Sequence, residues 1–335
     1  MPITSKFISL KEYIPAGNPK LSHFLINASE INLENSNDVL VKNEWISVDP
    51  YMRARMSERK NYKSPFELQK PMEGAAIGKV LDSNSSQFSV GDVVMSDFGW
   101  RDHYIAEEKK LKKIEPINVP LQTYLGPLGF TGHTAYIGLF RIGDLKENQT
   151  VLVSSAGGSV GSTVCQIAKI KGCKVIASTG SEEKVKWLTN ELGVNHAFNY
   201  KKVDNLVLHL KSLAPEGYDL YFDNVGGNFL ESAIYRMKNY GRIVICGRIS
   251  QMNASSPGEG LKNMAHVLVK RLTIKGFLIF DHFDDRNDFE KDMNNWILNN
   301  KIKWKETILE GIENAPQAFL DLLNGKNIGK MLVKI

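Results

Sequence analysis

The segment 150–179 constrains the fold of this chain most strongly, because it joins a buried strand, a glycine turn and an amphipathic helix. The apolar run 151–153 predicts a buried strand, and the turn 155–158 (Ser-Ala-Gly-Gly) follows it directly. Apolar residues within 160–168 then recur at helical spacing, and the β-branched run 174–176 predicts a second strand. This order of elements is that of the first crossover in a dinucleotide-binding fold.

Two glycines of this segment suit a bound dinucleotide. Gly158 ends the turn, and Gly161 lies in the first turn of the predicted helix. Without side chains they allow a pyrophosphate to approach the helix N-terminus, where amide groups and the helix dipole favour an anion. Glycines also occur in parallel crossovers that bind no nucleotide. Here the strand and helix patterns on both sides agree, so the sequence favours cofactor binding.

The end of the second strand distinguishes the two nicotinamide cofactors. A site for NAD(H) usually carries Asp or Glu there, which binds the ribose 2′-hydroxyl. Residues 178–181 are Ser-Thr-Gly-Ser, and Lys184 follows, where its ammonium can meet a 2′-phosphate. The alternative is a solvated lysine whose charge Glu182 and Glu183 soften. The missing carboxylate and the added cation together predict NADP(H).

Length and composition set the class of protein. A chain of 335 residues suggests two domains, and its net charge of +5 is spread too evenly for a nucleic-acid partner. The basic stretch 109–113 is short enough to be a solvated face, and no apolar run suits a membrane span or a signal peptide. Cys165, Cys173 and Cys246 form an odd set, which predicts reduced thiols in the cytoplasm.

The two halves of the chain have different patterns. Short β runs such as 43–48 and 91–95 predict a small β-rich barrel in the first third. Strands and helices alternate beyond the glycine turn. Four further strand patterns complete a doubly wound sheet of six strands: 196–200, 219–223, 242–247 and 275–280.

These patterns predict a domain organisation. A helical bridge at 123–138 leads into the sheet, and the strand-like tail 327–335 returns to the first domain. We expect a catalytic domain formed by 1–122 and 301–335, and an NADP-binding domain formed by 123–300. The loop containing 255–258 (Ser-Ser-Pro-Gly) is expected to lie over the site.

Several segments match a known family. They are Val-Asp-Pro-Tyr-Met-Arg at 48–53, Tyr-Phe-Asp-Asn-Val-Gly-Gly at 221–227, Cys-Gly at 246–247 and Asn-Ile-Gly-Lys at 327–330. With the glycine turn, they make the chain resemble the medium-chain dehydrogenases/reductases, and within these the zinc-independent prostaglandin reductase, leukotriene B4 dehydrogenase and curcumin reductase group. The resemblance implies an α/β fold, in which a Rossmann doubly wound parallel sheet is inserted in a β-rich GroES-like catalytic domain, often as a homodimer.

The resemblance also implies a set of cofactor residues. They are Gly158, Ser159, Val160, Gly161, Lys184, Tyr200, Asn224, Cys246, Gly247, Ile249, Ser250, Phe277, Leu278, Ile279 and Asn327, with Phe130 and Thr134 beside the nicotinamide. Phe277 and Ile279 also suit the core of a strand, and Asn224 also suits a turn without a ligand.

A catalytic zinc is not expected. Zinc enzymes of this superfamily need thiolate and imidazole ligands in the first domain and a structural lobe with four cysteines. No cysteine precedes Cys165, and Met72 stands where the resemblance places a zinc-ligating histidine.

The implied reaction is hydride transfer from NADPH to the β-carbon of an α,β-unsaturated ketone or aldehyde, followed by protonation of the enolate. Without a metal, the carbonyl oxygen needs a hydrogen-bond donor, and a tyrosine can supply one. Tyr51, within the family motif, is the first candidate, and Tyr62 and His282 are the others. Related enzymes carry a tyrosine where this chain has Met252 and Phe280, so the donor is open, and Tyr51 could instead only pack the domain interface.

Two other functions compete with a reductase of enones. One is a quinone reductase of the same superfamily, and the other is a nucleotide-binding protein that has lost its catalytic tyrosines. The expected partners are a small-molecule enone or enal and a second copy of the chain, with no nucleic acid and no membrane.

Overall fold

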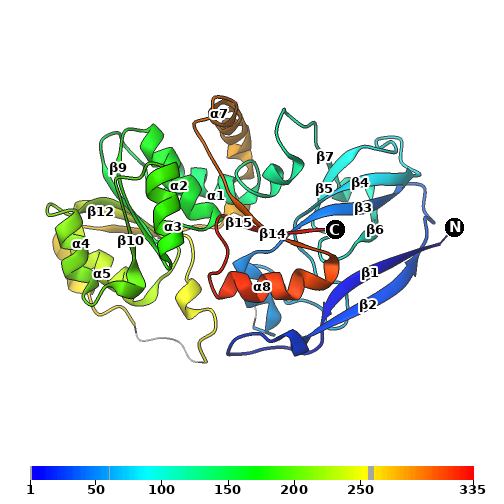
Figure 1. Ribbon diagram of the computed structural model, residues 1–335, viewed down its shortest axis with the longest axis horizontal. Helices are drawn as coiled ribbons and strands as arrows, with labels where there is room; N and C mark the ends of the chain where they lie inside the picture. Colours follow the sequence, from blue (N-terminus) through cyan, green and yellow to red (C-terminus); the bar gives the residue numbers. More distant parts are fainter. Residues whose placement is uncertain (1, 60, 256–259) are drawn as a thin grey trace. The chain divides into compact units, whose positions relative to one another are not determined.

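A computed structural model of the protein describes residues 2–59, 61–255 and 260–335 and divides the chain into two compact units (Figure 1). The first unit comprises Met1–Leu125, Glu306–Asn327 and Met331–Ile335, and the second comprises Gly126–Lys305 and Ile328–Lys330. Positions 256–258 of the loop that was expected over the site lie outside the described residues.

The second unit contains a six-stranded sheet whose strands are all parallel, in the order β10-β9-β8-β11-β12-β13. The strands are β8 (Thr150–Val153), β9 (Lys174–Thr179), β10 (His196–Asn199), β11 (Tyr218–Asp223), β12 (Met237–Ile245) and β13 (Thr273–Gly276). The chain leaves β8 on one side and returns to β11 on the other, so these two strands flank a topological switch point. The predicted doubly wound sheet is confirmed.

Helices cover both faces of this sheet. The helices are α1 (Phe130–Ile137), α2 (Ser159–Ile170), α3 (Glu182–Lys186), α4 (Leu206–Leu213), α5 (Gly227–Arg236), α6 (Met264–Lys270) and α7 (Arg286–Leu298). Leu210 of α4 and Phe229 of α5 pack in one core cluster with Tyr221 of β11. Neighbouring strand residues point to opposite faces, and Phe222 indeed meets Gly138, at the end of α1, on the other face.

The first crossover forms as the apolar spacing predicts. The strand residues 151–153 are completely buried, as expected of a parallel strand that is covered on both faces. Val164, Ile167 and Ala168 of α2 are also completely buried, because a spacing of three and four residues puts them on one helical face.

Two predicted strands end earlier than expected. The patterns 242–247 and 275–280 correspond to β12 and β13, which pair only as far as Ile245 and Gly276. Beyond Ile245, the amides of Cys246 and Gly247 donate to the Asp223 carbonyl of β11, so the chain leaves the position where it could pair with Phe277. The prediction of a strand through 277–280 is therefore wrong.

The first unit is rich in β-strands, as predicted. β1 (Ile3–Leu10) and β2 (Phe24–Ile31) form an antiparallel pair. A second sheet follows the order β14-β15-β3-β4-β5-β7, and β6 pairs with β3. Its strands are β3 (Asp38–Ser47), β4 (Ala76–Ser83), β5 (Val93–Ser96), β6 (His103–Glu107), β7 (Lys112–Lys113), β14 (Glu306–Glu310) and β15 (Lys330–Lys334). The α/β fold class implied by the resemblance is confirmed.

The core of the first unit brings distant segments of the chain together. The 3-10 helix Pro50–Met56 and α8 (Ala315–Leu323) contribute Met52 and Phe319 to one buried cluster, which also includes Trp100. β15 pairs antiparallel with β3, so the C-terminal tail is part of this unit. Among the described residues, no helix has the length and apolar character needed to cross a membrane.

Candidate functional site

The loops at the carboxyl ends of the parallel strands hold most of the predicted cofactor residues. Five strands each lead into one of these loops: β8 into the glycine turn, β9 toward Lys184, β10 into Tyr200, β11 into Asn224 and β12 into Cys246. Open parallel sheets bind ligands outside the carboxyl ends of their strands, at the switch point. The structure thus gathers these residues at one edge of the sheet in the second unit.

The glycine turn leaves space beside the start of α2. A Cβ atom at Gly161 would lie 2.5 Å from the Ser155 carbonyl oxygen, so α2 can pack on the turn only with glycine there. At Gly158, a Cβ would have no protein neighbour closer than 3.4 Å. No side chain caps the helix that follows, so the amides of its first turn can face a ligand. Ser159 and Val160, in this turn, are half-buried.

Lys184 is buried beside the glycine turn, so the alternative of a solvated lysine is wrong. Its side chain is 7% exposed. A Cβ at Gly157 would lie 2.7 Å from Lys184 Cδ and 2.8 Å from Thr179 Oγ1, which places the lysine stem directly over the turn. Burial, reinforced by the charge of Lys201, lowers the pKa of Lys184 to about 8. An anion at this point would favour the charged form of Lys184.

Tyr200 and Lys201 complete a cationic corner at the end of β9. A Cβ at Gly180 would lie 3.4 Å from Tyr200 Cε1 and 3.5 Å from Lys201 Cε. The next lysine, Lys202, forms an ion pair with Glu182 (3.1 Å). Sequence reasoning missed Lys201, although its position directly after Tyr200 was a signal that could have indicated it.

Asn224 ties the loop after β11 to the glycine turn. Its Nδ2 donates to the Ser154 carbonyl (2.8 Å), and its backbone N–H donates to Ser154 Oγ (3.0 Å). Because Ser154 directly follows β8, the loops of the two strands that flank the switch point are joined directly.

The loop 246–250 lies on the loop that follows β11. Its residues donate five hydrogen bonds to the end of β11 and the loop after it. The amides of Cys246 and Gly247 donate to the Asp223 carbonyl (2.9 and 3.0 Å), and the Ile249 amide donates to the Asn224 carbonyl (3.3 Å). The Ser250 amide and Oγ both donate to the Val225 carbonyl (3.2 and 2.6 Å). Burial and the nearby Asp223 raise the pKa of the Cys246 thiol to about 12, so this thiol stays protonated and is a poor nucleophile.

The residues predicted beside the nicotinamide form a second group. The ring of Phe130, at the start of α1, lies 5.5 Å from the ring of Phe280. Beyond the end of β13, Phe277 is half-buried, Leu278 is exposed in extended backbone, and Ile279 is buried. Thr134 is buried and donates to the Phe130 carbonyl within α1 (2.8 Å).

The C-terminal segment also reaches the glycine turn. Asn327 is buried and directly precedes the segment 328–330 of the second unit. There the Gly329 amide donates to the Gly157 carbonyl (2.9 Å). Gly329 has a φ of +67°, and a Cβ would lie 1.9 Å from the Lys305 carbonyl oxygen, so only glycine suits this position.

Tyr51 and Tyr62 are neighbours in the first unit. Tyr51 packs against the core cluster of that unit, whereas Tyr62 is exposed. Burial, with Asp49 and Asp97 nearby, raises the pKa of the Tyr51 phenol above its ordinary value, so the hydroxyl keeps the proton that a donor needs. Lys63 Nζ lies 5.6 Å from the centroid of the Tyr51 ring.

The arginines that follow Tyr51 hold neighbouring backbone segments. Arg53 donates to two carbonyls of the segment 14–17, at 3.0 and 2.9 Å. Arg55 donates to the Ser64 carbonyl (2.7 Å) and forms an ion pair with Glu73 (2.7 Å). The motif therefore combines a candidate donor with side chains that fix the chain around it.

His282 lies in the second unit, in a 3-10 turn before α7. Its Nδ1 is 3.5 Å from Asp285 Oδ2, and its ring centroid is 6.3 Å from that of Phe277. These contacts connect the segment 277–282 to the start of α7. A role for His282 as proton donor stays a prediction.

The donor set of the first unit does not suit zinc. Met72 is completely buried in the apolar cluster with Met52 and Trp100. Within the described ranges, no group of three or more His, Cys, Asp and Glu side chains could hold a metal ion.

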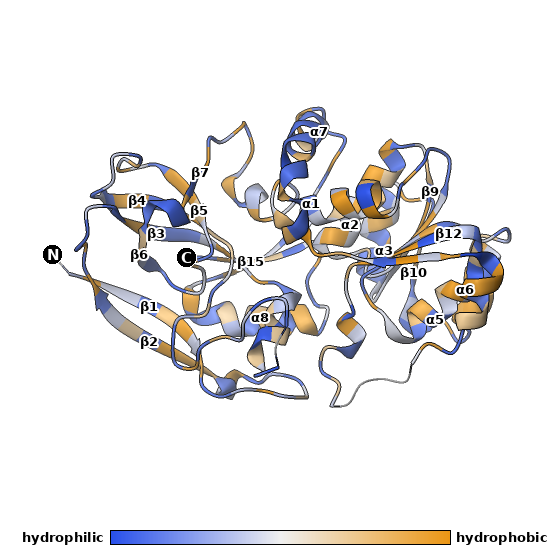
Figure 2. Ribbon diagram, turned by 180° about the vertical axis from the view of Figure 1, so that it is seen from behind, coloured by the Kyte–Doolittle hydropathy of each residue, from blue (hydrophilic) through white to orange (hydrophobic). Residues whose placement is uncertain are grey.

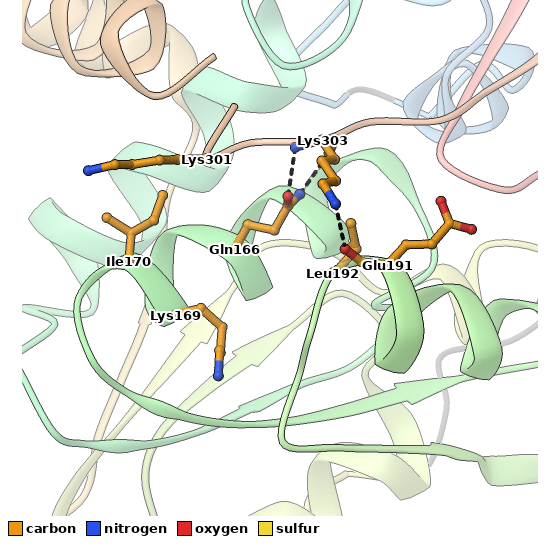
Figure 3. Close-up of a pocket in the computed structure, with 7 residues that line it drawn as sticks. All are labelled: Gln166, Lys169, Ile170, Glu191, Leu192, Lys301 and Lys303. Carbon is orange, nitrogen blue, oxygen red and sulfur yellow. Dashed lines mark hydrogen bonds between the residues drawn. The ribbon is translucent and has the colours of Figure 1, made fainter. Parts of the chain in front are cut away.

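A cavity of about 310 Å³ lies at the other end of α2 (Figure 3). There the Gln166 side chain accepts from the Lys303 amide and donates to the Lys303 carbonyl, both at 2.8 Å. Three lysines line the cavity: Lys169, Lys301 and Lys303. The Lys303 ammonium donates to the Glu191 carbonyl (3.4 Å), whereas that of Lys301 points away from it in Figure 3. None of the predicted cofactor residues lines it.

Comparison with known proteins identifies the relatives of this chain. Residues 6–114 match the N-terminal domain of oxidoreductase, and residues 159–299 match the family described as zinc-binding dehydrogenase. The 2-alkenal reductase (NADP(+)-dependent) of Nicotiana tabacum is 40% identical, over 99% of this chain and 98% of its own. Prostaglandin reductase 1 of Rattus norvegicus is also 40% identical, over 99% of both chains. The crystal structure of CurA in complex with NADPH from Vibrio vulnificus has a TM-score of 0.92 and 37% identity, over 98% of both chains.

Proposed function

Because the chain belongs to the zinc-independent medium-chain dehydrogenases/reductases, in the group of the prostaglandin and curcumin reductases, we propose that it reduces the C=C bond of α,β-unsaturated ketones or aldehydes with NADPH. It is an NADP-dependent oxidoreductase. The observation that carries the choice of cofactor is the buried Lys184 beside the glycine turn. The end of β9 at 178–181, where an NAD site would carry a carboxylate, has none.

The loops of the second unit suit NADPH. The open face of Gly158 and the first amides of α2 would hold the pyrophosphate, while Lys184, Lys201 and Tyr200 would surround the 2′-phosphate. Asn224 and the loop 246–250 would line the ribose. When bound, NADPH supplies the hydride.

The chain's own side chains then act on the substrate oxygen. As the β-carbon is reduced, the electron pair of the C=C bond moves toward the carbonyl and negative charge develops on its oxygen. We propose that the Tyr51 hydroxyl donates a hydrogen bond there, because a donor that is already in position stabilises the negative charge as it develops. The α-carbon then takes a proton from Tyr51 through water, and a proton from solvent restores the Tyr51 hydroxyl, which yields the saturated ketone or aldehyde.

A panel of substrates tests this function. We expect enones and enals to accelerate the loss of NADPH absorbance far more than quinones do, with NADPH strongly preferred over NADH. A higher kcat/KM for quinones than for any enone would instead support a quinone reductase. NADPH binding without turnover of any substrate would support a nucleotide-binding protein without catalysis.

Metal independence is a further expected result. The first unit offers buried apolar side chains such as Met72 where a zinc ligand would be needed. Extensive treatment with a chelator should leave turnover unchanged, and elemental analysis should find no stoichiometric zinc. One tightly bound zinc per chain that is required for turnover would contradict this prediction.

We also propose that the protein forms a homodimer through the edge of its parallel sheet. β13 is an edge strand, and in the described part of the chain only β12 pairs with it. The ribbon of α6 has mostly the hydrophobic colour in Figure 2. This helix exposes the apolar side chains of Met264, Leu268 and Val269, and Leu268 is 78% exposed. An open strand edge beside an apolar helix favours pairing with another copy. Light scattering that shows a monomer at micromolar concentration would contradict the dimer.

Domain roles and location complete the proposal. We propose that 123–300 binds NADP(H), and that 1–122 with 301–335 forms the catalytic domain. Cys165, Cys173 and Cys246 are all free thiols, which is typical of a reducing compartment and supports a cytoplasmic location. Cell fractionation that recovers the protein outside the cytoplasm would contradict the location.

A further inference from the structure

A buried group of polar side chains lies at the carboxyl ends of β8 and β11. It comprises Ser154, Tyr221 and Asp223, and none of the three is exposed to solvent. The Tyr221 hydroxyl donates to Asp223 Oδ1 at 2.6 Å, the shorter of its two contacts, and Ser154 Oγ lies 3.0 Å from the same hydroxyl. Residues two apart on a strand share a face, so Tyr221 and Asp223 are placed together by β11 itself.

The same carboxylate also binds the backbone of the loop that follows. Asp223 Oδ1 accepts from the amides of Val225 and Gly226, both at 2.9 Å, where the chain turns into α5. Burial raises the pKa of Asp223 above its ordinary value, although the hydrogen bonds from these amides act in the opposite direction. A carboxyl group is costly in such a position, and apolar side chains could fill the same space. We therefore interpret these hydrogen bonds as fixing the conformation of the loop after β11 rather than as stabilising the core.

Three loops at the cofactor edge meet at this group. Ser154 holds Asn224, which joins the glycine turn to the loop after β11. The Asp223 carbonyl accepts from Cys246 and Gly247, which joins the loop after β12 to the same point. A loop already held in one conformation loses less entropy when a ligand binds.

We propose that Tyr221, Asp223 and Ser154 are positioning residues for NADP(H), which hold the three cofactor loops in their binding conformation before the cofactor arrives. The proposal rests on the proposed function, since it names the cofactor of that function. None of the three side chains needs to touch the cofactor, and the effect passes through the backbone of 154–158, 224–226 and 246–250.

Tyr218 offers a matched control on the same strand. It is also completely buried, and its hydroxyl donates one hydrogen bond, to the Leu210 carbonyl of α4 (2.9 Å). Tyr218→Phe and Tyr221→Phe therefore remove the same atom from equally buried sites, but only Tyr221 is connected to the cofactor loops. We expect both variants to lower the melting temperature.

Binding of NADPH alone, measured by titration, then separates the two variants. Loss of a hydrogen bond to a buried charged group should raise the Kd about tenfold in Tyr221→Phe, while Tyr218→Phe stays within about twofold of the parent. The turnover of Tyr221→Phe at saturating NADPH should equal that of the parent, because the substitution weakens cofactor binding and not the reaction. Ser154→Ala provides a second variant if Tyr221→Phe does not fold, and its Kd should rise in the same direction.

Equal Kd values for the parent and Tyr221→Phe would overturn the proposal, and so would an equal rise in both tyrosine variants, because the cause would then be general destabilisation. A parent protein that does not bind NADPH would overturn the proposed function itself. That result is distinct, because it is read from the unmutated protein.

Discussion

Replacing Lys184 with alanine is expected to raise the Kd of NADPH by roughly 10- to 150-fold, because a charge-assisted contact with a phosphate is worth about 1.5–3 kcal/mol. The stem of Lys184 is buried over the glycine turn, which holds its ammonium in place, and Lys201 is the second lysine of this corner. The Kd of NADH, which has no 2′-phosphate, should change little. Isothermal titration with both cofactors measures the difference.

Lys186→Ala is the matched control, since Lys186 lies on the same helix and is exposed. The Kd of Lys186→Ala for NADPH should stay within about twofold of the parent.

The lowered pKa of Lys184, about 8, provides a second test of its role, in the pH dependence of binding. Above pH 8, Lys184 loses its proton in the free protein, so binding of the phosphate must take up a proton and the affinity should fall as pH rises. Lys184→Ala should lose this dependence. Equal affinity of the parent for NADPH and NADH would refute the assignment.

Replacing Tyr51 with phenylalanine is expected to slow single-turnover hydride transfer by up to about 10²-fold, with the Kd of NADPH unchanged. Loss of one donor to a developing oxyanion costs on the order of 10²–10³ in rate. A smaller loss is expected here, because the ribose 2′-hydroxyl can share the task. An interaction made only in the transition state lowers turnover without changing cofactor affinity. Rapid mixing of substrate with the NADPH-loaded enzyme measures this step.

Tyr13→Phe controls for packing. Tyr13 and Tyr51 both lie against the core cluster of the first unit, and the Tyr13 hydroxyl donates to the Phe66 carbonyl (3.0 Å). Its loss should change thermal stability but not hydride transfer. If Tyr51→Phe reacts as fast as the parent and only melts earlier, Tyr51 packs the domain without donating. The donor would then be sought at Tyr62 and His282.

Local patterns were sufficient to predict the parallel sheet and its glycine turn. β8 and α2 form where the apolar spacing predicts them. A buried strand and a helix buried on one face each require apolar residues at a characteristic spacing, which can be recognised in the sequence. The cofactor loops follow from the same order, since the carboxyl ends of parallel strands share one edge. The roles of single residues in those loops stay predictions.

Strand ends depend on partners that lie far along the chain. β13 stops at Gly276, although the apolar run continues, because β12 turns away to bind the Asp223 carbonyl. No window of sequence around 275–280 contains that information.

Burial decided what local sequence left open at Lys184, Lys201 and Tyr221. The sequence also allows a solvated Lys184 beside two glutamates, and only the approach of Gly157 and Thr179 shows that the lysine is enclosed. Lys201 lies near the end of β9 because β10, which precedes it, pairs with β9. Tyr221 is connected to the cofactor loops because its hydroxyl contacts both Asp223 and Ser154. The sequence by itself determined which elements form, since periodicity is a local property. The tertiary structure decided which charges and hydroxyls meet, because hydrogen bonds and desolvation depend on distances of a few ångströms between segments far apart in the chain.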